Sequence, residues 1–180
     1  SGVGEDEYSR AQYAPHPILS GLISKQGLIM AIAIVNLLAL GILFYLTEAL
    51  GWPIAAFALS AIFIIVGYVV PPMQFKQRGL GEAGVALLWG PLMVGGTFYA
   101  TTGTLEAWVL VVSLPYAILV TTALIGKNVD HIEADTELGI RTIPVLLGVE
   151  KALFMNQQLM VTFFVFVVSL ILIEIGRAHV

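Results

Sequence analysis

The 180-residue sequence contains no cysteine and few charged residues. The absence of cysteine excludes disulfides, thiolate nucleophiles and cysteine-based zinc sites. Only 11% of the residues are charged and 58% are hydrophobic, with a mean hydropathy of +0.94, which is far from the composition of a soluble domain or a disordered segment. Eight basic against twelve acidic side chains give a net charge of −4, so we expect no nucleic-acid partner, which would require a basic face. The composition predicts an integral membrane protein with the lipid bilayer as its surroundings.

Five stretches of 18 to 22 residues carry no charged side chain: 27–47, 53–70, 83–100, 107–126 and 152–173. A hydrocarbon layer of about 30 Å is crossed by about 20 helical residues, so each stretch is long enough to span it. Apolar residues fill each stretch almost all round, without the alternation of a barrel strand, and backbone groups in lipid must be satisfied internally. The pattern predicts an all-α, polytopic membrane helix bundle rather than buried helices of a soluble protein.

Basic residues are distributed unevenly between the connecting segments. Seven of the eight lie in segments 1–26, 71–82 and 127–151, whereas connectors 48–52 and 101–106 contain none. The positive-inside rule then places the three basic segments on the cytoplasmic side. We expect a multi-pass protein of the cell inner membrane with these segments cytoplasmic.

Both ends of the chain have unusual compositions. The sequence starts at Ser1 with a polar, acidic segment that is not a signal peptide, so we expect the interior of a longer protein. Residues 175–180 read IGRAHV, which resembles a translated sequencing adapter, and we interpret them as a non-native tail. Residues 1–173 are then part of a single transmembrane domain.

Two prolines lie within predicted spans. Pro91, followed by a Gly-Gly pair, and Pro115 have two interpretations. They kink their helices around a cavity, or they are tolerated among packed neighbours.

The segment 127–148 concentrates acidic residues. Four of the twelve acids fall within eight residues: Asp130, Glu133, Asp135 and Glu137. Such a cluster is either a solvated loop or a site for a hard cation such as Mg²⁺, which takes carboxylate oxygens and bridges to substrate phosphates. On one continuous helix, Asn128, His131 and Asp135 share a face, while the remaining acids form another.

Basic residues accompany this cluster. Lys127 and Arg141 flank it, and Lys76 and Arg78 lie on the neighbouring basic segment. Arginine and lysine bind phosphate, as a fork and as a point charge respectively. Acids for a metal and bases for an anion on one membrane face suggest a metal-bound diphosphate.

These residues carry a resemblance to a known family. The segment resembles the second aspartate-rich motif of the UbiA superfamily of intramembrane prenyltransferases, with matches at Asn128, Asp135, Gly139, Arg141, Thr142 and Leu147-Gly148. Three further stretches resemble the branch that prenylates dihydroxynaphthoate for menaquinone: residues 16–24, 78–82 and 89–99. The resemblance covers nearly all of residues 1–173.

The resemblance implies a fold of nine transmembrane helices, of which these five would be the third to seventh. It implies transfer of a prenyl chain from an isoprenyl diphosphate to an aromatic acceptor, with Mg²⁺ held between two acidic motifs. Dihydroxynaphthoate is the expected acceptor, with 4-hydroxybenzoate, a chlorophyll-type ring, haem and a lipid glycerol left open. Three acids are the candidate catalytic and metal-binding residues: Asp130, Glu133 and Asp135. Six residues are the candidate diphosphate-binding set: Lys76, Arg78, Lys127, Arg141, Asn128 and Tyr68.

Two departures from the family pattern affect these expectations. His131 occupies the usual position of the first aspartate, and imidazole is a poor Mg²⁺ ligand, so Asp130 or Glu133 would replace it. The first aspartate-rich motif is absent, since the chain begins just beyond it; Glu5 and Asp6 are expected to be loop residues. We therefore expect residues 1–180 alone to be inactive. A membrane transporter and an inactive structural fragment remain the alternatives.

Overall fold

The computed structural model describes residue 18 and residues 20–178, with side chains to residue 173. Glu5, Asp6 and His16 lie outside the described residues. The chain divides into two compact units, Ser1–Tyr45 and Leu46–Val180. Every regular element in the described part is a helix, which confirms the predicted all-α class.

Five helical stretches are long and apolar enough to cross a membrane, by length and composition: Lys25–Leu50, Trp52–Val69, Gly81–Thr102, Ala107–Asp130 and Val149–Ile173. Each overlaps one of the charge-free stretches, and most extend beyond it because flanking polar residues continue the helix. The five expected membrane helices are therefore confirmed.

Helix α1 (Lys25–Leu50) has no buried side chain. Its polar residue Asn36 is satisfied within the helix, since the side-chain amide donates to the carbonyl of Ile32 at 2.8 Å. Such internal bonding is what a polar side chain of a membrane helix requires.

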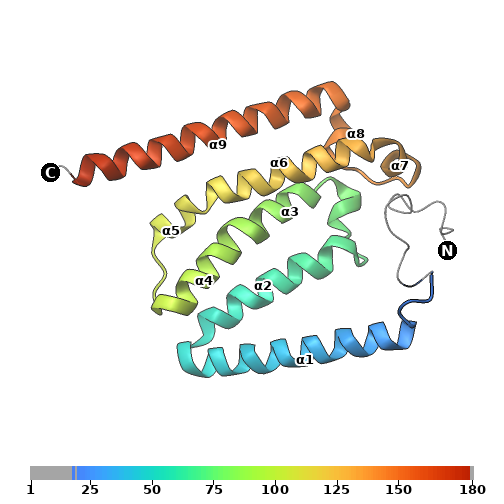
Figure 1. Ribbon diagram of the computed structural model, residues 1–180, viewed down its shortest axis with the longest axis horizontal. Helices are drawn as coiled ribbons and strands as arrows, with labels where there is room; N and C mark the ends of the chain where they lie inside the picture. The colour runs from blue at the N-terminus through green and yellow to red at the C-terminus, as the bar shows by residue number, and fades with distance from the viewer. Residues whose placement is uncertain (1–17, 19, 179–180) are drawn as a thin grey trace. The chain divides into compact units, whose positions relative to one another are not determined.

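The second unit is a row of antiparallel helices that follow one another in chain order (Figure 1). Helix α2 (Trp52–Val69) packs against α3 (Gly81–Leu87) and α4 (Met93–Thr102), α3 packs against α6 (Leu114–Asp130), and α6 packs against α9 (Val149–Ala178). Because each membrane span runs opposite to the one before it, the segments after α2 and after α6 meet at the same end of this unit.

The third span is interrupted near its middle. A π-helical turn, η3 (Leu88–Leu92), joins α3 to α4 and contains Pro91. Proline has no N–H to donate along the helix, and a wider turn accommodates that loss. The preceding Gly90 lies so close to α6 that an added Cβ would stand 2.5 Å from the Cβ of Ala117.

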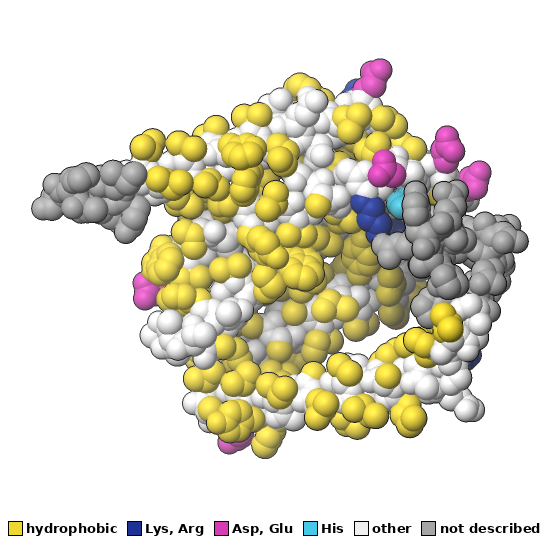
Figure 2. Space-filling model, in the orientation of Figure 1, with side chains coloured by type: hydrophobic (Ala, Val, Ile, Leu, Met, Phe, Trp, Pro, Cys, Tyr) yellow, Lys and Arg dark blue, Asp and Glu magenta, His cyan; other side chains and the backbone are white. Residues whose placement is uncertain are grey.

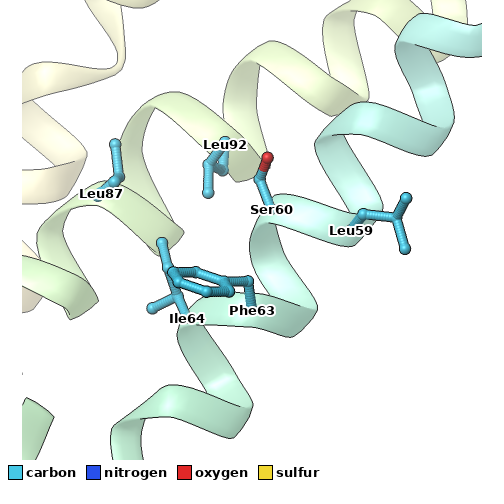
Figure 3. A pocket seen from close by; sticks show the side chains of 6 residues that line it. All are labelled: Leu59, Ser60, Phe63, Ile64, Leu87 and Leu92. Carbon is cyan, nitrogen blue, oxygen red and sulfur yellow. The ribbon is translucent and has the colours of Figure 1, made fainter. Parts of the chain in front are cut away.

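A cavity of about 500 Å³ lies between α2 and this interrupted helix (Figure 3). Its lining is almost entirely apolar: Leu59, Ser60, Phe63, Ile64, Leu87 and Leu92. Two of these residues, Leu87 and Leu92, stand on either side of Pro91, so the proline lies beside a cavity.

The fourth span is also made of two helices. Ser113 separates helix α5 (Ala107–Val112) from α6, and Pro115 stands in the first turn of α6. Proline is tolerated there because the first N–H groups of a helix have no intrahelical partner.

Short helices form the polar end of the second unit. These are η2 (Phe75–Arg78), α7 (Ile132–Glu137) and α8 (Ile143–Leu147). The continuous helix assumed for residues 128–137 is not formed, because α6 ends at Asp130 and α7 begins after His131. Figure 2 shows hydrophobic side chains along the long helices and a gathering of acidic and basic ones near α7.

Candidate functional site

Asp135 is the buried acid of the acidic segment. It lies in α7 with 6% exposure, and its Oδ1 atom is 3.7 Å from Nζ of Lys76 in η2. That distance exceeds a hydrogen bond, so the attraction is mainly electrostatic. The pair joins the two basic segments that sequence reasoning placed on one face.

The backbone around Asp135 is fixed at both sides. Its N–H donates to the carbonyl of His131 at 2.9 Å, and its carbonyl accepts from the N–H of Ile140 at 2.8 Å. Gly139, with φ of 68°, makes the turn that brings Ile140 back, a conformation that favours glycine. The backbone conformation at position 139 therefore explains why the motif has a glycine there.

A second buried acid, Glu82, lies in the first turn of α3 with 3% exposure. Its Oε1 atom accepts two hydrogen bonds of 2.9 Å, one from Nδ2 of Asn128 and one from the backbone N–H of Ile143. One carboxylate oxygen thus connects α3, the end of α6 and the start of α8.

The Arg-Thr pair of the motif lies between α7 and α8. Thr142 is 2% exposed, and its hydroxyl has no hydrogen-bond partner in the described part of the chain. The carbonyl of Arg141 is 3.4 Å from the point where a Cβ on Gly79 would stand, so this turn packs against the end of η2. The side chain of Arg141 is exposed.

Tyr68 lies at the end of α2, next to the start of α3. Its hydroxyl would be 3.5 Å from a Cβ added to Gly81, and the Cα of Lys76 would be 3.4 Å from the same point. Tyr68 and Lys76 therefore converge on the residue that precedes Glu82.

The structure brings together four of the nine predicted site residues: Asp135, Lys76, Asn128 and Tyr68. The other five are exposed at the same end of the unit: Asp130, Glu133, Arg78, Lys127 and Arg141. The two helical faces expected for this segment separate by burial as well, since Asn128 and Asp135 are buried while Asp130, Glu133 and Glu137 are exposed. This separation persists across the break at His131.

The carboxylate side chains at the polar end of the second unit meet part of what a magnesium site requires. Within the described residues, no three His, Cys, Asp or Glu side chains are close enough to hold a metal ion. Mg²⁺ commonly uses one or two protein carboxylates, retains waters and bridges to substrate phosphates. Asp135 provides a carboxylate of the kind used at one such position, so the described residues fit a magnesium site through one ligand and form no metal cage of their own.

Sequence reasoning did not identify Glu82 as a site residue. The available signal was a lone carboxylate at the last position of the basic segment 71–82, where an apolar span begins. Such a charge must be solvated or paired, but its partners are 46 and 61 residues away and are not visible in a local pattern.

The cavity between α2 and α3 begins about one to one and a half helical turns from these polar residues. Leu87 follows Glu82 by five positions, about 7.5 Å along a helix, and Ile64 precedes Tyr68 by one turn. A polar end and an apolar cavity thus occur in succession along the same two helices, an arrangement suited to an amphipathic ligand with an anionic head.

Comparison with known proteins identifies a family and several relatives. The model of the UbiA prenyltransferase family matches residues 9–178. A 1,4-dihydroxy-2-naphthoate octaprenyltransferase of Haemophilus influenzae is 30% identical over 97 residues, which are 54% of this chain and 32% of that protein. A chloroplastic chlorophyll synthase of Avena sativa is 31% identical over 145 residues, covering 76% of this chain and 37% of that protein.

A third relative, UbiA prenyltransferase domain-containing protein 1 of Dictyostelium discoideum, is 28% identical over 119 residues, 66% of this chain and 35% of its own length. No solved structure matches the chain. The chain spans about a third of the length of these curated relatives. The family model nevertheless covers nearly all of the chain, and with five membrane-crossing helices the chain is part of a multi-pass membrane protein. It belongs to the UbiA prenyltransferase family.

Proposed function

We propose that this chain forms one half of the diphosphate site of an Mg²⁺-dependent prenyltransferase. The observation that carries the proposal is the pairing of buried Asp135 with Lys76 at the polar end of the second unit. The family's prenyltransferases and the named relatives support this reaction class. The other half, a first aspartate-rich motif, would come from a preceding segment of a longer protein.

The reaction is the displacement of diphosphate from an allylic carbon. The C–O bond to diphosphate breaks, the allylic cation is attacked by an electron-rich ring carbon, and that carbon then loses its proton. When bound, Mg²⁺ would neutralise the charge that develops on the leaving group. Asp135 would hold the ion, with Asp130 or Glu133 as further candidate ligands at the exposed face.

Basic residues supply the remaining positive charge. Lys76 is half-buried beside Asp135, and three bases are exposed around it at the same end: Arg78, Lys127 and Arg141. Charges in these positions bind the diphosphate and stabilise it as it departs. Asn128 and Tyr68 complete the proposed diphosphate-binding set.

We propose dihydroxynaphthoate as the acceptor, because two curated relatives are named as naphthoate octaprenyltransferases. The chlorophyll synthase covers more of the chain, so a chlorophyll-type ring is the second candidate. The apolar cavity beside Leu87 would receive part of the prenyl tail.

The test uses the purified longer protein that contains this chain, in detergent or proteoliposomes. It is incubated with geranylgeranyl or octaprenyl diphosphate and each acceptor, with Mg²⁺ or with EDTA. We expect a prenylated naphthoate and released diphosphate only with Mg²⁺. Absence of transfer to every acceptor by a folded protein would refute the proposal. We expect the 180-residue chain alone to give no product, because it carries one acidic motif.

A further inference from the structure

Two carboxylates are buried in the part of the chain that the structure describes, and only Asp135 has a place in the proposed chemistry. The other, Glu82, is the more deeply buried, at 3% exposure. It lies in the first turn of a predicted membrane helix, where an unpaired charge is costly. A buried acid in that position requires specific partners.

Both partners of Glu82 belong to the motif segment. The N–H of Ile143 is the first of helix α8, and such a group has no acceptor within its own helix. The preceding Thr142 makes no side-chain cap, so Glu82 caps α8 from another helix. The same Oε1 atom also accepts from Nδ2 of Asn128.

The orientation of the Asn128 amide follows from that fact. An acceptor oxygen faces the NH₂ group of Asn128, at 2.9 Å, and this leaves the amide oxygen directed elsewhere. Glu82 thereby determines which end of the Asn128 side chain is available to a ligand. It also fixes the turn between Asp135 and Ile143, which carries Arg141.

We propose that Glu82 is a positioning residue for the diphosphate site, acting through Asn128 and through the turn that ends at Ile143. This inference rests on the proposed function. Glu82 need not contact the substrate. Its removal would leave the Asn128 amide and the Ile143 N–H without their buried acceptor, and both would then lose their fixed positions.

The first experiment measures the bridge itself and does not require activity. Hydrogen–deuterium exchange of the peptide covering residues 138–147 is compared in the longer protein and its variants. Glu82→Ala should accelerate exchange in this peptide, whereas Glu82→Gln should preserve the protection, because the amide retains an Oε1 acceptor. Unchanged exchange in Glu82→Ala would overturn the bridge.

The second experiment measures the effect on substrate binding. Glu82→Ala should raise KM for the prenyl diphosphate by about ten-fold, the scale of losing one buried hydrogen bond, and leave KM for the aromatic acceptor nearly unchanged. Glu82→Gln should restore the diphosphate KM. Thr122→Val removes an equally buried hydroxyl of α6 that bonds within its own helix, and should change neither KM.

A double-mutant comparison tests action through Asn128. Glu82→Ala combined with Asn128→Ala should raise the diphosphate KM over that of Asn128→Ala by less than the full factor of Glu82→Ala, because one of the two routes of Glu82 runs through Asn128. Multiplying losses, or a Glu82→Gln variant with the diphosphate KM of Asn128→Ala, would overturn the proposal. If Glu82→Ala fails to fold, the diphosphate KM of Glu82→Gln is the deciding measurement.

These experiments distinguish a failure of the proposed function from a failure of the positioning role of Glu82. A wild-type protein that transfers no prenyl group refutes the proposed function, while exchange at residues 138–147 still judges the bridge. A wild-type protein that transfers normally, with a Glu82→Ala variant of unchanged diphosphate KM, refutes this inference alone.

Discussion

Burial distinguishes Asp135 from the other acids of its segment. Asp135 is 6% exposed and faces Lys76, whereas Asp130, Glu133 and Glu137 are exposed. Asp135→Asn keeps the side-chain shape but removes the charge. We expect turnover of the longer protein to fall by roughly 10²-fold or more, the scale of one electrostatic stabiliser. The measurement is kcat at saturating prenyl diphosphate and Mg²⁺.

Glu137→Gln is the matched control, because it removes the same charge from an exposed position in the same short helix. It should retain most of the activity. If Asp135→Asn kept near-normal turnover and Mg²⁺ dependence in a folded protein, the acidic segment would be a solvated loop after all.

The sequence predicted part of this residue-level arrangement. Helical spacing separated Asn128 and Asp135 from the exposed acids, and burial follows the same division although the helix breaks at His131. Glu82 was missed because its role depends on contacts across 46 and 61 residues, which only the packing of α3, α6 and α8 creates.

At the scale of elements, the contact between η3 and α6 depends on the absence of a side chain at Gly90. A Cβ there would lie 2.5 Å from the Cβ of Ala117, closer than carbon atoms approach. Gly90→Ala must therefore displace one helix, at a cost of about 1–3 kcal/mol for an overpacked interface. We expect a lower thermal midpoint in detergent, measured by intrinsic fluorescence.

Gly126→Ala in α6 is the control for this substitution, since nothing lies within 4 Å of its added Cβ. It should leave the midpoint unchanged or slightly higher, because alanine favours the helix over glycine by up to about 1 kcal/mol. Equal midpoints for the two variants would show that η3 and α6 do not pack this closely.

The cavity between α2 and α3 gives a second prediction at this scale, which concerns the length of the prenyl chain. Leu87→Trp would fill part of the space of about 500 Å³ next to the polar end. If the prenyl tail occupies it, kcat/KM for geranylgeranyl diphosphate should fall about ten-fold relative to geranyl diphosphate, the scale of lost apolar contacts. Leu119→Trp, on the exposed side of α6, should leave the ratio unchanged. An unchanged ratio in Leu87→Trp would place the tail elsewhere.

Span lengths and charge distribution predicted the five membrane helices, whereas the two prolines left open whether the helices are interrupted. A run of apolar residues specifies that a segment crosses the bilayer, while its local geometry depends on neighbours. Pro91 signalled a possible kink, and the π turn with its adjacent cavity is consistent with one of the two interpretations left open.

At the scale of the whole molecule, the positive-inside rule predicts how the second unit is oriented in the membrane. Two of the basic segments, 71–82 and 127–151, meet at one end of the second unit through Lys76 and Asp135. The connector 103–106, at the other end of α4, contains no Lys or Arg. We therefore expect the polar end of this unit to face the cytoplasm.

Single cysteines introduced into a cysteine-free protein test this orientation, and residues 1–180 contain no native cysteine that must be replaced. Gln77→Cys and Thr136→Cys lie at exposed positions of the polar end, and Thr104→Cys lies in the opposite connector. An impermeant maleimide applied to intact cells should label only Thr104→Cys, whereas inverted membrane vesicles should reverse the pattern. Labelling of Gln77→Cys and Thr136→Cys from opposite sides would contradict the antiparallel arrangement of α2, α3–α4 and α6. Labelling of both from outside would instead reverse the orientation, and the acidic segment would then face away from the cytoplasmic supply of prenyl diphosphate that the proposed reaction needs.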